Sequence, residues 1–287
     1  MSDLTVLERV LRRDRTVVAA ALVALFILSW AYLLTGAGAG MRPWEMTTLS
    51  LFPHKAALAP MVAEAMPGMD MPGMSTRGAA PEPAGFWLTV AMWWTMMVAM
   101  MSPSAAPAVL LYARVARHSA SAQPAASSIG PNGAFLAGYL AVWLTFSLAA
   151  AFLQGALQSL GLLSPAMLGS QSRWLSAAVL AAAGVYQLSP AKQLCLTQCR
   201  TPAAFFTRHW RPGVVGAVRL GALHGAYCVG CCWVLMALLF VGGVMNMAWV
   251  AALTLLVMAE KLLPRGAWVA RASGLALIAW AGATLLV

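Results

Sequence analysis

Charged side chains are scarce in this chain, and their scarcity limits what the protein can be. Lys, Arg, Asp and Glu make up 9% of the 287 residues, whereas 61% of the residues are hydrophobic. A soluble globular domain contains about 25% charged residues, so the composition excludes an ordinary soluble enzyme. Segments of about ten residues that alternate between polar and apolar, as in a membrane β-barrel, are also lacking. The sequence therefore predicts a polytopic membrane protein of the all-α class.

Sequence motifs for energy-driven or catalytic chemistry are missing as well. The chain has no GxxxxGK[ST] loop for nucleotide phosphates, and no connection between its apolar runs could hold a soluble ATPase domain. No Ser/His/Asp arrangement and no pair of carboxylates stands out. These absences argue against ATP-driven pumping by this chain alone, and they predict that the protein is not an enzyme.

Seven apolar segments are candidates for membrane spans, which need about 20 residues each. They predict a transmembrane helix bundle of about seven spans, at 17–36, 86–112, 133–158, 172–189, 216–242, 246–262 and 268–286. The first span follows a cluster of arginines; if it is a cleaved signal peptide, six spans remain. The predicted divisions are an N-terminal segment with the first span (1–36), an outer loop rich in Met, Pro and Gly (37–85), and a helical membrane metal-binding domain (86–287).

Positive charges are concentrated in alternate connections of the predicted bundle. They cluster before the first span, after the second, between the fourth and fifth, and around the connection from the sixth to the seventh. By the positive-inside rule, this asymmetry predicts an inner (cytoplasmic) membrane protein whose N-terminus is cytoplasmic and whose 37–85 loop lies outside. Membrane topology and anionic lipid account for the net charge of +10, so no nucleic-acid partner is expected.

Three of the five cysteines lie in one stretch, HGAYCVGCCW, within the predicted fifth span. The spacing i, i+4, i+7, i+8 puts four donors on one helical face: His224, Cys228, Cys231 and Cys232. Met236 extends this face by one turn. Packing is the plain alternative for each residue alone, because free cysteine behaves as a small apolar side chain. Together, thiolate, imidazole and thioether suit Cu(I), and a bound cation offsets the cost of a thiolate in the membrane. We therefore predict an intramembrane Cu(I) site.

The predicted second span carries a stripe of methionines. Met96, Met97, Met100 and Met101 lie on neighbouring faces of this helix. A methionine stripe in an apolar helix is usually packing. If the stripe faces the cysteines of the fifth span, these four thioethers become outer ligands of the predicted copper site, and both interpretations stay open.

Two further features of the apolar segments predict contacts within the bundle. Gly221 and Gly225 form a GxxxG pattern, which lets two membrane helices approach closely. Glu260 lies near the end of the predicted sixth span, where a carboxylate is costly unless it is paired.

A short helix is predicted between the fourth and fifth spans, on the cytoplasmic side. Ser189 suits an N-cap and Pro190 suits the first helical position. Cys195 and Cys199 then share one face at i and i+4. A cytoplasmic port for metal and a simple packing pair both fit this spacing.

The predicted outer loop contains a small repeat, MPGMDMPGM. Its prolines and glycines argue against a regular helix. Thioethers are soft donors that do not form disulfides in an oxidising compartment, so we predict that the loop captures or hands over copper through Met66, Met69, Met71 and Met74. A low-complexity linker without function is the alternative.

Two other functions use the same residues differently. Cys228 and Cys231 form a CxxC pair, which can exchange disulfides, so a membrane thiol–disulfide carrier is one alternative. Such a carrier should also present an outward-facing cysteine pair, and the predicted outer loops contain no cysteine. A structural subunit that packs against a larger membrane enzyme and binds no metal is the other alternative.

Three sequence blocks carry a resemblance to a known family. They are WxxMxxAMMxPS at 93–104, PxKxxCLxxCRxP at 190–202, and HGxxCxGCCW at 224–233 with Glu260-Lys261 further on. With these blocks the chain resembles a bacterial family of predicted metal-binding integral membrane proteins, which are copper-chaperone-like and associated with membrane tyrosinases. The resemblance implies a helical membrane protein that binds copper and supplies a cuproenzyme. The combined prediction is a membrane protein that binds Cu(I) through Cys, His and Met and transfers it to a copper-dependent partner.

Overall fold

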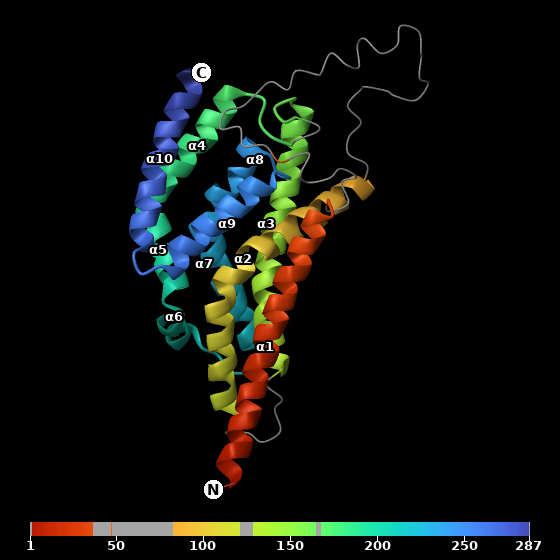
Figure 1. The fold of residues 1–287 in the computed structure, drawn as a ribbon, viewed down its shortest axis with the longest axis vertical. Coiled ribbons are helices and arrows are strands. Elements are labelled where there is room, and N and C mark those ends of the chain that lie inside the picture. The colour runs from red at the N-terminus through yellow and green to blue at the C-terminus, as the bar shows by residue number, and fades with distance from the viewer. Residues whose placement is uncertain (1, 37–46, 48–82, 121–128, 165–167, 287) are drawn as a thin grey trace.

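The structure, a computed structural model, describes residues 2–36, 47, 83–120, 129–164 and 168–286 (Figure 1). Within these ranges the chain is helical, and its only β pairing is an isolated bridge between Leu163 and Ser170. The helices are α1 (Ser2–Leu34), α2 (Pro83–Ala120), α3 (Ile129–Ser159), α4 (Arg173–Leu188), α5 (Pro190–Arg200), α6 (Pro202–His209), α7 (Gly213–Ala237), α8 (Leu239–Gly242), α9 (Met247–Leu262) and α10 (Gly266–Leu286). The all-helical fold class is therefore confirmed.

Five stretches of helix in the described ranges are long and apolar enough to cross a membrane. They are Thr16–Leu34, Gly85–Ala116, Gly130–Ser159, Gly213–Gly242 and Gly266–Leu286. Large apolar side chains on these helices, such as Phe152, Val215 and Leu286, are exposed, as expected for surfaces that contact lipid. The termini lie at opposite ends of the long axis (Figure 1).

The count of about seven spans is not confirmed. The segments 172–189 and 246–262 correspond to α4 and α9, which have 16 residues each. This is shorter than the span of about 20 residues that a bilayer requires. The chain leaves α4 at Ser189-Pro190, where a new helix begins, and Asn246 caps the start of α9 through its side chain.

Helix α7 lies inside the bundle, packed against α3, α4 and α5. The GxxxG pair faces α3, as the pattern predicts. A Cβ atom on Gly221 would collide with the carbonyl oxygen of Phe135, and one on Gly225 would lie 3.1 Å from the carbonyl oxygen of Tyr139. Only glycine permits this close approach, which brings Tyr139 of α3 next to the cysteines of α7.

Helix α2 bends partway along its length (Figure 1). Pro103 and Pro107 lie inside the helix, and each removes a backbone hydrogen bond and bends the helix axis. The half of α2 that precedes the bend contains the methionine stripe. Helix α1 packs along α2, and α9 contacts α2 from another direction, so α2 lies between them.

Candidate metal centre

The cysteine face of α7 points into the bundle and away from lipid. Cys228, Cys231 and Cys232 are each 1% exposed, and His224 is 3% exposed. The thiols of Cys231 and Cys232 both donate hydrogen bonds to the carbonyl oxygen of Cys228, at 3.1 and 3.0 Å. The spacing of these residues in the sequence therefore corresponds to a buried helical face.

The sulfur of Cys228 is surrounded by polar groups from two other helices. The ammonium group of Lys261, on α9, donates a hydrogen bond to this sulfur at 2.9 Å. The hydroxyl of Tyr139, on α3, lies 3.1 Å from the same sulfur. Lys261 Nζ also donates to Ser104 Oγ on α2 at 3.4 Å. An ammonium group at this distance stabilises negative charge on the sulfur, and little water is present to screen it.

One methionine of the α2 stripe reaches the cysteines. The Sδ atom of Met101 lies 3.9 Å from Cys232 Sγ and 4.0 Å from Lys261 Nζ. A thiol and a thioether from two helices thus lie side by side, and both are soft metal ligands.

The other predicted methionine ligands are buried within the bundle. Met96, Met97 and Met100 are fully buried in the same apolar core as the cysteines. Met236 is also fully buried and lines a separate cavity of about 320 Å³ with Trp93.

His224, on the same face of α7, is surrounded by aromatic rings. Its ring lies 6.2 Å from the ring of Phe135, 6.0 Å from that of Tyr139 and 5.6 Å from that of Phe205, measured between centroids. Its Nδ1 atom is buried and has no hydrogen-bond partner in the described part of the chain. The imidazole therefore lies on the aromatic side of the α7 face.

The predicted short helix is present as α5, and the side chain of Ser189 caps it by accepting a hydrogen bond from the Lys192 amide at 3.2 Å. Its cysteines lie against α7, whereas the sequence suggested a separate cytoplasmic site. A Cβ atom on Gly230 would lie 2.9 Å from Cys195 Sγ. Burial, with the neighbouring Cys231, raises the pKa of the Cys195 thiol.

Cys199 brings the second thiol of α5 to the same cluster. The neighbouring thiols of Cys228 and Cys231, together with burial, raise the pKa of the Cys199 thiol. All five cysteines are free, and they lie on α5 and α7, which pack against each other. The tight contact at Gly230 and the hydrogen bond that the Tyr186 hydroxyl donates to the Gly230 carbonyl hold α4, α5 and α7 together.

The described residues contain no group of three His, Cys, Asp or Glu side chains arranged so that they could hold a metal ion. The sulfur of Cys232 lies 3.9 Å from that of Met101, and methionine is not one of those residue types. Met66, Met69, Met71 and Met74 of the outer repeat lie outside the described residues.

A buried polar network joins α4, α5 and α9. Lys192 of α5 forms a 2.6 Å ion pair with Glu260 of α9, and both side chains are almost fully buried. Gln187 of α4 donates to Glu260 at 2.6 Å and accepts a hydrogen bond from Lys192. The carboxylate of Glu260 is paired, as its place in an apolar helix requires. Glu260 and Lys261 are neighbours in sequence, but Glu260 pairs with Lys192, whereas Lys261 contacts Cys228.

Sequence reasoning missed the position of Lys261 within the site. The residue stands among the basic residues that set topology, yet its side chain is only 7% exposed. An ionisable residue next to a second one inside an apolar segment is a functional signal in a membrane protein, and the Glu260-Lys261 pair carries it.

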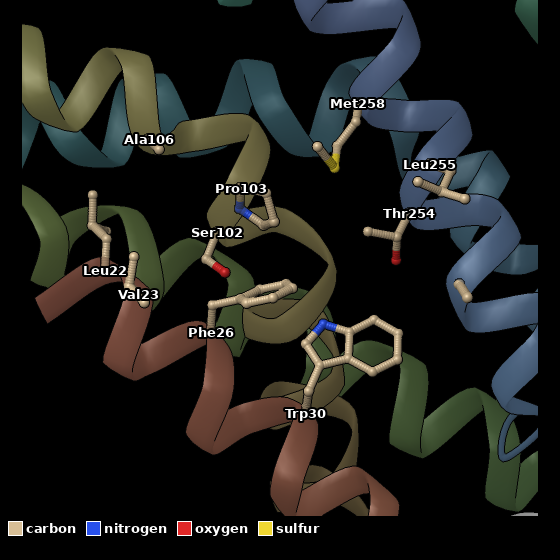
Figure 2. Close-up of a pocket in the computed structure, with 11 residues that line it drawn as sticks. Leu22, Val23, Phe26, Trp30, Ser102, Pro103, Ala106, Thr254, Leu255 and Met258 are labelled. Atoms are coloured by element: carbon tan, nitrogen blue, oxygen red, sulfur yellow. The ribbon is translucent and has the colours of Figure 1, made fainter. Parts of the chain in front are cut away.

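A cavity of about 550 Å³ opens elsewhere in the bundle, between α1, α2 and α9 (Figure 2). Its walls are apolar side chains, with Ser102 and Thr254 as the exceptions, and the sulfur of Met258 points into it. No cysteine lines it, so it is separate from the thiol cluster.

Comparison with known proteins gives one match. A family model described as "PpoB2: Copper chaperone" matches residues 90–284, which is more than half of the chain. No curated protein and no solved structure matches the chain. The matched residues include all five cysteines, the methionine stripe of α2 and Lys261, whereas the methionine repeat of the outer loop lies outside them.

Proposed function

Because the chain belongs to the PpoB2 copper chaperone family, we propose that it binds Cu(I) through sulfur ligands within the membrane and passes it to a copper-dependent partner protein. The single observation that carries this proposal is the sulfur pair formed by Cys232 and Met101, 3.9 Å apart, beside Cys228. Thiolate with thioether favours Cu(I) over harder ions.

The donor set fits a monovalent soft ion. Cys228 and Cys232 supply two thiolates, and Met101 supplies a thioether. Each thiol loses its proton when the ion binds, so the hydrogen bond that Cys232 donates to the Cys228 carbonyl is given up. The backbone of α7 continues through this turn, and the carbonyl keeps its partner within the helix.

The remaining predicted ligands act around this set. Cys231 and Cys199 lie next to Cys228 and exchange the ion with it, and Cys195 is the port at which copper enters or leaves. Met96, Met97 and Met100 belong to the buried core around the cysteines, and His224 and Met236 lie about one helical turn beyond the thiols on α7; these five residues act as secondary ligands during transfer. The methionines of the outer repeat serve the other face of the membrane. Transfer by ligand exchange needs no fuel when the receiving site binds copper more tightly.

The proposed setting is the inner membrane, with the N-terminus in the cytoplasm. The apolar helices support a membrane location, and the distribution of basic residues supports this orientation. The partner is a copper-dependent enzyme, and the chain itself carries out no catalysis.

Metal binding by the purified full chain tests the proposal. The protein is extracted in detergent without oxygen and titrated with Cu(I) against a competing chelator. We expect a stoichiometric Cu(I) complex that is lost in Cys228→Ser and Cys232→Ser. The matched control is Met245→Leu, which alters a fully buried methionine outside the site. A wild-type protein that takes up no Cu(I) against the chelator contradicts the proposal.

A further inference from the structure

Lys261 is a buried cation, and its ammonium group contacts sulfur and oxygen atoms of side chains on other helices. Its ammonium nitrogen lies 2.9 Å from Cys228 Sγ, 3.4 Å from Ser104 Oγ and 4.0 Å from Met101 Sδ. The adjacent carboxylate of Glu260 faces Lys192, 2.6 Å away. The charge of Lys261 is therefore available to the sulfur site.

Counting charges shows what this cation does for a bound metal. Cu(I) exchanges for the protons of two thiols without any change of oxidation state, and the resulting bis-thiolate complex carries one net negative charge. A charge left uncompensated in an apolar interior is costly. The ammonium of Lys261 makes the complex neutral, and the neighbouring pair of Lys192 and Glu260 is neutral by itself.

The same count disfavours a divalent ion. Zn(II) bound by the same two thiolates is already neutral, and Lys261 then remains as an unbalanced positive charge beside it. The attraction or repulsion between unit charges at these distances is strong when water is scarce. A fixed positive charge at this point thus distinguishes between ions by their valence.

We propose that Lys261 is the specificity-determining residue that makes the sulfur site select a singly charged soft cation over a doubly charged one. This inference rests on the proposed function of the site, and it adds a physical reason why the site selects one metal ion over another. Lys261 acts through the charge of the complex, so it is a positioning and charge-balancing residue rather than a ligand.

The experiment compares Ag(I) and Zn(II) binding to the purified full chain in detergent without oxygen, with Cu(I) as a third probe. The variants are Lys261→Met and Lys261→Gln, which remove the charge, and Lys261→Arg, which keeps it. We expect the ratio of Ag(I) to Zn(II) affinity to fall by at least about tenfold in Lys261→Met and Lys261→Gln, and to stay within about threefold of wild type in Lys261→Arg. Lys261→Gln retains a hydrogen-bond donor for Cys228, so this variant stays informative if Lys261→Met does not fold.

The matched control removes the neighbouring buried pair as a whole, as Lys192→Met/Glu260→Gln. That change leaves the local net charge unaltered, so the affinity ratio should remain that of wild type. If the neutral variants at Lys261 lose Ag(I) and Zn(II) binding in parallel, or keep the wild-type ratio, the inference is wrong while the copper site stands. If wild-type protein binds neither Ag(I) nor Cu(I), the proposed function and this inference both fall.

Discussion

The Sγ atom of Cys232 on α7 lies 3.9 Å from the Sδ atom of Met101 on α2, although 131 residues separate them in sequence. The bend of α2 and the position of α9 bring Lys261 to the same two helices. The candidate site is therefore made by several helices, α2, α3, α7 and α9 among them, and not by the cysteine helix alone.

Replacement of Met101 by leucine should weaken Cu(I) binding and leave the fold intact. Leucine keeps the apolar volume, so the free energy of unfolding should change by less than about 1.5 kcal/mol. Chelator competition measures the affinity, and thermal unfolding in detergent measures the stability. Met245→Leu should lower neither. Equal copper affinity in the two variants would exclude Met101 as a ligand.

The Gly221→Ala substitution should separate α3 from α7. The added methyl group meets the carbonyl oxygen of Phe135, and overpacking of this kind costs about 1–3 kcal/mol. The midpoint of thermal unfolding should fall. Gly155→Ala is the control, because a Cβ atom there meets nothing within 4 Å. Equal midpoints for the two variants would show that the GxxxG contact contributes nothing.

Breaking one half of the buried ion pair should destabilise the bundle more than removing both halves. Lys192→Met leaves the Glu260 carboxylate without its cation, which costs about 3–5 kcal/mol. The double variant Lys192→Met/Glu260→Gln has no unpaired charge and should recover much of the stability. Thermal unfolding of the three proteins provides the comparison. A double variant that is less stable than the single one would contradict this account of the pair.

Bound copper should protect the buried thiols from oxidation. All five cysteines are free, so denatured, reduced protein should give five titratable thiols. After mild oxidant, metal-free protein should lose thiols, and Cu(I)-loaded protein should keep those of Cys228 and Cys232. The alternative, a thiol–disulfide carrier, predicts a reversible loss of two thiols that copper does not prevent and that Cys231→Ser abolishes.

Local sequence signals predicted the helices well because they depend on neighbours in the chain. The Ser189-Pro190 signal for the start of α5 is confirmed, and so is the approach of a second helix to the GxxxG pair. The predicted count of about seven spans is not confirmed, since α4 and α9 are apolar enough to resemble spans but are 16 residues long.

The site itself was predictable only in part. Helical spacing is sufficient to place the cysteines of α7 on one face, and the buried face confirms it. The spacing does not reveal which α2 methionine meets that face, since this depends on the bend at the prolines. The spacing also does not show that α5 lies against α7. That contact is close at Gly230, where glycine has no side chain to occupy the space next to Cys195.

The most direct test of the central claim is X-ray absorption at the copper edge of Cu(I)-loaded protein in which selenomethionine replaces methionine. The account predicts sulfur neighbours from Cys228 and Cys232 and one selenium neighbour, with the selenium signal lost in Met101→Leu and kept in Met245→Leu. A copper ion surrounded by nitrogen or oxygen alone, or a selenium neighbour that persists in Met101→Leu, would contradict it.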